Sequence, residues 1–425
     1  MVNRMKVVWQ KLKKNDTDYR EKHKLSYYWI ISFSIIVLFY LCMFTRFITD
    51  YGTHTNSMEN MSIRPLLNPL NWISWFSEHG YPLWHICGHI IMRVWGCPAN
   101  YAAGISSGLF IIISYIAVLK FLENTFRNRQ VNENLLAILV FVLFIVGPVW
   151  LPWQKEYIIL HNGGPNVWHN ATNICGRAIG IIVFGYSLRL IEKIVDSNYE
   201  IKIPVKRYVL LSLLCLLSLI AKPSFVQSFV PAFGILLIYY LIRSRGKFKN
   251  YFGGFVAIAV VPGIKLLFQF SHYFSSNPEK AGIMTEKTGQ GLIIEVPTID
   301  TIVGLISNQG LILAFPIFMF TIMIIYKKID KYHAMSIMML LFSMIYILTL
   351  KGSASGEMGW AYYIALFFVF MIGIRDYIYI FVDDKRILAH SYGGVFTVAT
   401  IILGEHFVVG LYYLYMLIIM GQLRF

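Results

Sequence analysis

Charged residues are scarce in this chain of 425 residues, and no long soluble stretch interrupts it. Asp, Glu, Lys and Arg make up 14% of the sequence and hydrophobic residues 57%, and the mean hydropathy is +0.60. This balance excludes an ordinary soluble globular protein. The alternating segments of about ten residues that form a transmembrane β-barrel are missing too. The chain consists instead of apolar segments of about 17–22 residues, each able to cross a hydrocarbon core of about 30 Å as a helix.

Cysteine and acidic residues are also few. The 5 cysteines have no Cys-x-x-Cys spacing, so neither a zinc motif nor a redox motif is predicted. Only 22 acidic residues accompany 37 Lys and Arg, which gives a net charge of +15. The basic residues lie in short stretches between apolar segments, as in positive-inside topology, and no basic face belongs to a soluble domain. We therefore predict no nucleic-acid partner.

The apolar segments predict an all-α fold, a polytopic transmembrane helical bundle that forms a single integral membrane domain over residues 1–425, with about eleven or twelve spans. Residues 1–27 would be a basic leader in the cytoplasm. Residues 81–96 are apolar but short, and we interpret them as a re-entrant or interfacial helix, because a crossing there would move the following basic loops outward. The expected spans cover residues 28–48, 101–122, 135–153, 177–195, 208–221, 229–242, 252–270, 311–326, 334–350 and 361–374, and a last one begins at 387.

In this topology the polar stretches face outward. The largest is a first outer loop, residues 50–100, which carries the interfacial or re-entrant helices. Further outer loops are expected at 154–176 and 271–300. Because these loops hold most of the unusual polar residues and are too small to fold alone, we expect chemistry at the outer membrane boundary.

Asp50 follows directly after the first apolar segment, and His54 comes four residues later. A carboxylate where a helix leaves the membrane can accept a proton from a hydroxyl within hydrogen-bond reach. We therefore expect Asp50 to act as a catalytic base, with His54 orienting it or binding sugar. The alternative is a solvated charge that ends a helix.

The stretch 154–176 is rich in hydrogen-bonding side chains, and Arg177 follows it at the start of an apolar segment. A cation there is costly unless it is paired or reaches the interface, and arginine binds phosphate oxygens in a bidentate manner. The residues expected to bind a lipid phosphate are Lys155, Arg177 and Lys222. Those expected to bind an acceptor or a sugar are His161, Asn166, Trp168, His169, Asn170 and Glu357. The alternative for the cations is that they only snorkel toward the interface.

A metal site is left open. Asp50, His54, His161 and His169 could converge on a divalent cation, but only Asp50 and His54 have a compact ligand spacing on one helix. No ligand set is therefore assigned.

Several of these features occur in a familiar order. Asp50 lies just beyond a first span, a large outer loop follows, and Gly80-Tyr81-Pro82-Leu83-Trp84-His85 leads into an amphipathic segment. Together they resemble the GT-C superfamily of polytopic membrane glycosyltransferases. Residues 165–172 and 221–225 also resemble bacterial membrane proteins associated with surface-polysaccharide synthesis. The two-acid signature of protein mannosyltransferases is absent, since Tyr51 follows Asp50, and so is the WWD-type signature of oligosaccharyltransferases.

The resemblance implies an inverting glycosyltransferase that moves a sugar from a polyprenyl-phosphate-type donor to a glycan, lipid or protein acceptor. It would act at the outer face of the membrane, among membrane lipids. The short cytoplasmic loops and the abundance of Ile and Lys indicate a bacterial cytoplasmic (inner) membrane. Two alternatives remain. One is a polymerase or ligase of lipid-linked glycans. The other is a flippase or transporter, which places ionisable residues in broken helices near the membrane midplane, where Lys265 is the main residue of that kind.

Overall fold

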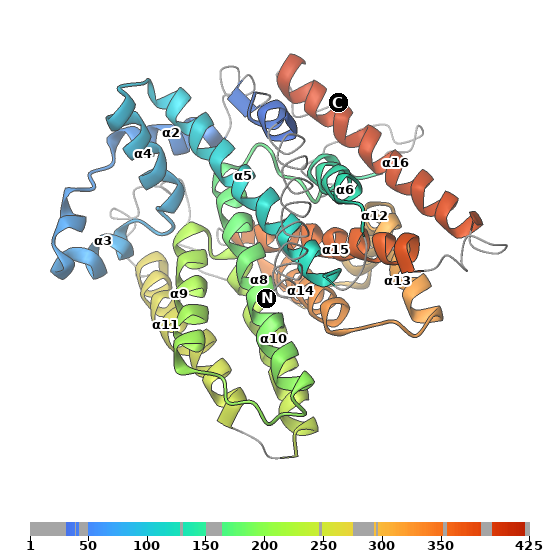
Figure 1. Ribbon diagram of the computed structural model, residues 1–425. Coiled ribbons are helices and arrows are strands. Elements are labelled where there is room, and N and C mark those ends of the chain that lie inside the picture. The colour runs from blue at the N-terminus through green and yellow to red at the C-terminus, as the bar shows by residue number, and fades with distance from the viewer. Residues whose placement is uncertain are drawn as a thin grey trace, which may run out of the picture.

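The computed structural model describes residues 31–38, 40–41, 50–127, 131–149, 164–245, 249–274, 293–294, 296–351, 355–383 and 393–420. These residues form helices and their connections, apart from one antiparallel pair of two-residue strands, β1 (Ile293–Ile294) and β2 (Leu350–Lys351) (Figure 1). Residues 31–38 are helical. The later helices are α2 (Asp50–Asn60), η1 (Arg64–Leu67), η2 (Pro69–Asn71), α3 (Trp72–Glu78), α4 (Leu83–Trp95), α5 (Ala99–Thr125), α6 (Glu133–Ile145), α8 (Ala171–Asp196), α9 (Val205–Ala221), α10 (Ser224–Arg243), α11 (Lys249–Phe274), α12 (Ile299–Ile312), α13 (Ala314–Ile325), α14 (Lys331–Thr349), α15 (Ser355–Asp383), α16 (Gly393–Tyr415) and the π-helical turn η5 (Met416–Met420).

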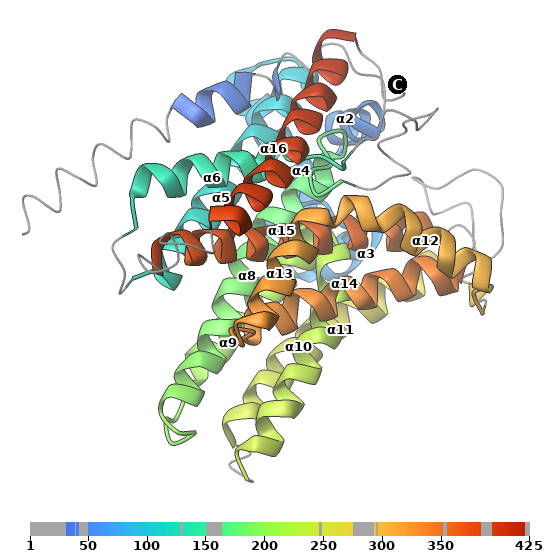
Figure 2. The same cartoon turned by 90° about the vertical axis from the view of Figure 1, so that its right-hand side faces the viewer.

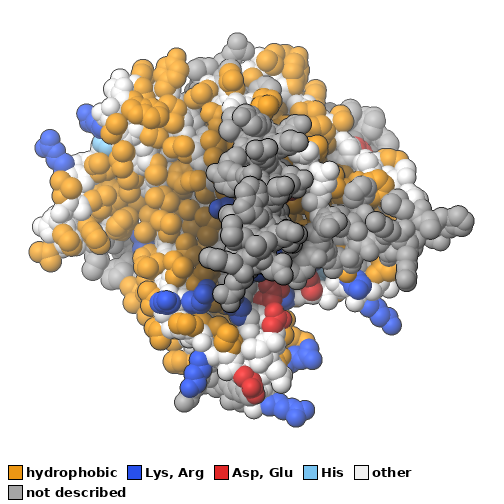
Figure 3. Space-filling model, viewed as in Figure 1, with side chains coloured by type: hydrophobic (Ala, Val, Ile, Leu, Met, Phe, Trp, Pro, Cys, Tyr) orange, Lys and Arg blue, Asp and Glu red, His pale blue; other side chains and the backbone are white. Residues whose placement is uncertain are grey.

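Six of the described helices have the length and composition of membrane spans. They are α5, α8, α10, α14, the segment Gly359–Ile380 of α15, and Gly393–Met420, which contains α16. Hydrophobic side chains dominate the upper part of the face in Figure 3, and Lys and Arg gather toward its lower end. Exposed Lys202, Lys206 and Arg243 lie near the ends of α9 and α10. The chain is thus a polytopic helical membrane protein, as the sequence predicts, while the count of eleven or twelve spans stays a prediction.

Three predicted segments differ from the observed helices. The span expected at 135–153 ends as a helix at Ile145, where Gly147 and Pro148 follow, and proline disfavours helix in the residue before it. The span expected at 311–326 is divided between α12 and α13, with Pro316 in the first turn of α13. Proline cannot donate the hydrogen bond that would continue the first helix. Helix α8 begins at Ala171, so Arg177 lies inside it rather than at its start.

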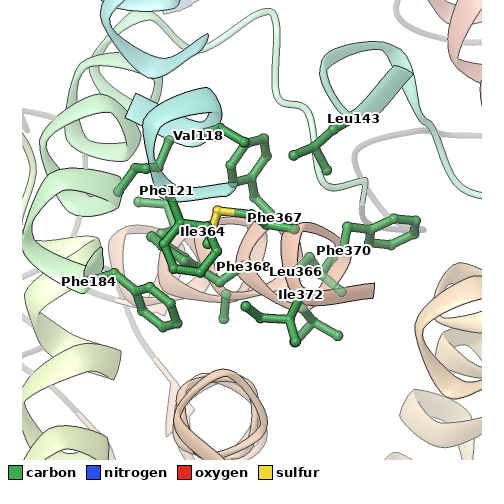
Figure 4. Packing of buried hydrophobic residues seen from close by; sticks show 14 of the residues in the cluster. Val118, Phe121, Leu143, Phe184, Ile364, Leu366, Phe367, Phe368, Phe370 and Ile372 are labelled. Atoms are coloured by element: carbon green, nitrogen blue, oxygen red, sulfur yellow. The ribbon is translucent and has the colours of Figure 1, made fainter. Parts of the chain in front are cut away.

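Helices α8 and α15 form the centre of the bundle (Figure 2). Helix α8 packs against α5, α9, α10 and α15, and α15 packs against α10, α13 and α14. Figure 4 shows the aromatic core between them, where Phe121, Phe184, Phe367 and Phe368 meet. A helix that is apolar on all sides lies in a protein core or spans a membrane, and 89% of the residues in an 18-residue window of Gly359–Ile380 are buried within the protein.

Two glycines let α8 approach the turn between α9 and α10. A Cβ atom at Gly176 would lie 2.9 Å from the Cβ of Lys222, and one at Gly180 would lie 2.6 Å from the ring of Phe225. Small residues four positions apart allow close packing of membrane helices. Lys222 is therefore placed against the first turns of α8.

The first loop packs onto the bundle through α2 and α4, which contact α5 and α8. Helix α4 has 13 residues, fewer than the roughly 20 that a membrane span needs, and the interfacial or re-entrant placement of residues 81–96 stays a prediction. Lys265 of α11 donates a hydrogen bond to the carbonyl of Phe76 in α3. The residue that the sequence singled out as an intramembrane cation thus attaches the first loop to α11.

Candidate functional site

Polar residues from three separate segments meet at the N-terminal end of α8. We call Asn166, His169, Asn170, Arg177 and Lys222 the polar cluster. Each of these side chains is between 1% and 4% exposed. All five were predicted from the sequence, and so was Trp168, which is 2% exposed beside them. Neither cation snorkels to the surface.

Arg177 is held at the end of α6. Its Nη1 donates a 2.7 Å hydrogen bond to Oδ1 of Asn166. The Nδ2 group of Asn166 donates to the carbonyls of Leu143 and Val146, at 2.8 and 3.0 Å, where α6 ends. Because the C-terminal end of a helix carries partial negative charge, the end of α6 favours a cation in this place.

Arg177 has no carboxylate partner in the described part of the chain. Its guanidinium carbon lies 5.0 Å from the ring centroid of Phe144 and 4.5 Å from that of Phe367. Its buried Nε has no hydrogen-bond partner there either. Arginine keeps its charge in such surroundings, and a buried donor without an acceptor costs about 1–3 kcal/mol. An anionic ligand would remove that cost.

Lys222 lies in the turn between α9 and α10. Its Nζ donates to Oγ1 of Thr172 at 3.1 Å and to Oδ1 of Asn170 at 3.5 Å. It also lies 5.1 Å and 5.0 Å from the ring centroids of Tyr81 and Trp360. Asn170 is the N-cap residue of α8, so the ammonium group lies beside a helix N-terminus. Like the ammonium group, the dipole and the N–H groups of that helix end favour a negative charge.

Two tyrosines, one before the first loop and one at its start, border the polar cluster at Trp168. The hydroxyl of Tyr40 donates a 2.7 Å hydrogen bond to the carbonyl of Trp168, and that of Tyr51 lies 3.3 Å from the same oxygen. Nε1 of Trp84 donates to Oγ of Ser107 in α5 at 3.0 Å. Tyr40, Tyr51 and Ser107 were not predicted, because a single tyrosine or serine in an apolar segment carries no signal of its own.

His54 and His85 form a pair in which Nδ1 of His54 lies 3.1 Å from Nε2 of His85. The His85 ring also hydrogen bonds to the backbone of Tyr81. If Nδ1 of His85 donates that bond, its Nε2 accepts from Nδ1 of His54, and Nε2 of His54 carries a lone pair. Burial lowers the pKa of His85 to about 4, and burial together with His85 and Lys222 lowers the pKa of His54 well below its usual value. Both rings are therefore neutral near pH 7, and Nε2 of His54 can accept a hydrogen bond.

His169 is a third neutral histidine in this region. Its Nδ1 lies 3.0 Å from the hydroxyl of Tyr413, and burial, with a smaller effect of Lys222, lowers its pKa to about 3. Within the described residues its Nε2 has no hydrogen-bond partner, nor do Oδ1 of Asn173 and Nε1 of Trp168. Buried polar atoms without partners are rare in folded proteins, so these three atoms indicate a place for water or a polar ligand.

Two cavities lie in this region, one lined by Arg177 of the polar cluster and the other by Trp168 beside the cluster. One, of about 10 Å³, lies against Arg177, Asn173 and Tyr363, and is room for about one water molecule. The other, the apolar cavity, has a volume of about 250 Å³ and lies between residues 36–40, α6, Trp168 and the segment of α16 and η5. Its lining residues are Ile36, Tyr40, Phe141, Ile145, Trp168, Leu411, Leu414, Tyr415, Ile418 and Ile419.

Four predicted site residues lie outside what the structure describes. Lys155 and His161 are outside the described residues, and for Asp50 and Glu357 only the helical backbone is described. In the described part of the chain, no three His, Cys, Asp or Glu side chains come together as metal ligands. The expectation of a divalent cation therefore stays untested.

No family model, no curated protein and no solved structure matches this chain. What the site can bind must be inferred from its own chemistry.

Proposed function

We propose that this protein is a membrane glycosyltransferase of the GT-C type, which moves a sugar from a polyprenyl-phosphate-type donor to a glycan, lipid or protein acceptor. The observation that carries the proposal is that a buried cationic site adjoins an apolar cavity, with Trp168 beside both. A lipid-linked sugar has the matching parts, an anionic phosphate next to an apolar chain. The reaction would take place at the outer membrane face, with α3 and α4 along that face and about eleven or twelve crossings in all.

Arg177, Lys222 and the N-terminus of α8 would bind the phosphate. Arg177 supports this role most directly, because its Nε is a buried donor without an acceptor among the described residues. Cations positioned at a leaving phosphate stabilise the charge that develops on it, which is a large catalytic term. The lipid chain would occupy the apolar cavity, at about 0.8 kcal/mol for each CH₂ group that is buried.

In the proposed step, an acceptor hydroxyl oxygen attacks the anomeric carbon of the sugar. The bond from that carbon to the phosphate oxygen breaks, and its electron pair leaves with the phosphate. A base takes the hydroxyl proton. Asp50 is the proposed base, and His54, four residues later in α2, lies on the same helix face. His54 would orient Asp50 or bind the sugar through its Nε2. General bases typically contribute about 10²–10⁴-fold to a rate.

A flippase for lipid-linked sugars is the second candidate, favoured by one specific observation. Helix α6 ends at Ile145 while residues 146–149 stay buried, and Arg177 lies at that broken end. Buried cations at interrupted helices are a feature of transporters. A polymerase or ligase of lipid-linked glycans would use the same cations on a larger substrate.

The test is sugar transfer in proteoliposomes, with radiolabelled polyprenyl-phosphate and polyprenyl-diphosphate sugars as donors. Arg177→Met removes the phosphate contact, and Asp50→Asn removes the proposed base. Each should lower transfer by about 100-fold or more. Arg243→Ala, at an exposed arginine on α10, is the matched control and should transfer at the wild-type rate.

Two further outcomes decide between the candidates. A donor with a chain of two isoprene units should bind more weakly than the full-length donor, because it leaves the apolar cavity partly empty. Absence of product with every donor, together with movement of the lipid-linked sugar across the bilayer that Arg177→Met abolishes, would overturn the transferase in favour of the flippase.

A further inference from the structure

A second group of ionisable side chains lies far from the polar cluster. Asp330, His333, Arg375 and Asp376, which we call the charged quartet, join the turn before α14 to α15. His333 and Asp376 are 0% exposed, and Arg375 is 3% exposed. Trp360, which contacts Lys222 from the same helix α15, lies about 24 Å along that helix from Asp376 at 1.5 Å per residue. The quartet therefore belongs to the other end of the bundle.

Both ring nitrogens of His333 face carboxylates. Nδ1 lies 2.8 Å from Oδ1 of Asp330, and Nε2 lies 2.8 Å from Oδ2 of Asp376. Because an ionised carboxylate only accepts hydrogen bonds, both contacts are favourable only when the ring carries a proton on each nitrogen. In that state the two negative carboxylates balance the two positive charges of His333 and Arg375. Nη1 of Arg375 lies 2.9 Å from Asp330, and its Nη2 lies 2.8 Å from Asp376.

The same Nδ1 also faces two donors. The backbone N–H of Asp330 lies 3.1 Å from it, and Nη2 of Arg375 lies 3.2 Å from it. A neutral ring that keeps its proton on Nε2 still donates to Asp376 and accepts one of these bonds at Nδ1. The carboxylate of Asp330 then still accepts hydrogen bonds from Nη1 of Arg375, at 2.9 Å, and from the backbone N–H of Tyr332, at 3.0 Å. A proton can therefore leave Nδ1 while every group retains a hydrogen-bond partner.

We propose that Nδ1 of His333 is a proton-binding site, and that the bound proton fastens the turn before α14 to the first turn of that helix. When the proton leaves to water, two lone pairs face each other across the contact between His333 and Asp330, and the contact opens. Water reaches it from the Asp330 side, because that side chain is 41% exposed whereas those of His333 and Asp376 are buried. No residue of the polar cluster takes part, so the proton site is independent of sugar transfer.

The other charged or titratable side chains near the quartet come from α14, α8 and α10: Tyr332, Lys331, Glu192, Arg189 and Tyr240. Lys331 and Glu192 pair at 2.8 Å and offset each other. The ring of Phe320 in α13 packs 5.1 Å from that of His333. Although burial raises the pKa of Asp330, its hydrogen bond from His333 and the charge of Arg375 hold that pKa below its usual value. Asp330 therefore stays ionised, and the proton belongs to the imidazole.

The test uses the full-length protein in lipid nanodiscs, labelled with ¹⁵N in the histidine rings. Ring ¹⁵N spectra distinguish an imidazolium from a neutral imidazole, and His333→Gln assigns the resonance. From about pH 6 to about pH 9, the His333 ring should pass from doubly protonated to neutral in one step. Over the same range amide exchange of residues 326–334, corrected for intrinsic base catalysis, should rise about threefold or more.

Asp330→Asn is the matched variant, because it keeps the shape and removes the charge that favours the second proton. Its His333 ring should be neutral at about pH 6, and amide exchange of residues 326–334 should no longer respond to pH. This shift also assigns the ring if His333→Gln does not fold. A wild-type His333 ring that is neutral at about pH 6, or that titrates without any change in the exchange of residues 326–334, would overturn the proposal.

Discussion

Helix α15 contacts two buried charged regions that are built in opposite ways. In the polar cluster, Arg177 has neutral hydrogen-bond partners, aromatic rings and the end of a helix around it, with no carboxylate among the described residues. In the charged quartet, Arg375 and His333 meet two carboxylates at 2.8–2.9 Å. A buried group of charges holds a structure together when every charge has its partner, whereas an unbalanced buried charge attracts a ligand of opposite sign. This difference is why we interpret the polar cluster as a binding site and the charged quartet as a structural contact between helices.

The histidines follow the same division. Near the polar cluster, burial and the charge of Lys222 keep His54 and His169 neutral. In the quartet, His333 contacts a carboxylate through each ring nitrogen. The first environment rejects a proton and the second accepts one.

The largest expected effect comes from breaking the balance of the quartet. Asp376→Ala leaves Arg375 and His333 with one carboxylate between them, and should lower the free energy of unfolding by about 3–5 kcal/mol. Arg177→Met, which removes a cation without a carboxylate partner in the described residues, should change it by less than about 1 kcal/mol. Chemical unfolding in detergent micelles measures both. Equal losses in the two variants would make Arg177 a structural residue rather than a ligand-binding one.

Acid should lower the free energy of unfolding through His85, which is buried near the polar cluster. The pKa of His85 falls on folding from about 6.5 to about 4, chiefly through burial. Its contribution is fully present above about pH 6.5 and decreases as the pH falls, because the unfolded state takes up a proton that the folded state rejects. The loss is about 1.4 kcal/mol per pH unit, up to about 3 kcal/mol near pH 4.

The measurement for His85 is the free energy of unfolding at a series of pH values between about 4 and about 8. His85→Gln should make the free energy of unfolding fall less steeply with decreasing pH, by the amount that one histidine contributes to that slope. An acid slope that is the same in His85→Gln and the wild type would show that the ring is not held neutral.

The smallest effect concerns the position of Lys222. In Gly176→Ala the new Cβ would lie 2.9 Å from the Cβ of Lys222, which should move the turn away from α8 at a cost of about 1–3 kcal/mol and weaken donor binding. Gly185→Ala is the control on the same helix, since its Cβ would meet Phe121 at an ordinary 3.6 Å. It should be neutral or stabilise by up to about 1 kcal/mol. Thermal unfolding and donor titration should therefore separate the two variants.

The sequence predicted much of the fold because the length of an apolar segment is a local property. The spans expected at 101–122, 229–242 and 334–350 lie within or overlap α5, α10 and α14. The breaks near Pro148 and Pro316 were not predicted, because both prolines lie in long apolar stretches and composition alone does not show where a helix stops. In the candidate site, Asn166, His169, Asn170, Arg177 and Lys222 were found through their concentration in polar loops. Tyr40, Tyr51 and Ser107 come from apolar segments and could be recognised only by their contacts.

The sequence by itself determined that the chain is a helical membrane protein with unusual polar residues next to its apolar segments, since hydropathy and segment length fix both. Tertiary structure decided which of those residues meet. Lys222 is far from α8 in the chain and lies against its first turns because Gly176 leaves room for it there. Asp330 and Asp376 flank one imidazole because α14 packs along α15. Helix packing therefore decided whether each buried cation met a carboxylate or a neutral amide, a distinction that residue type alone does not carry.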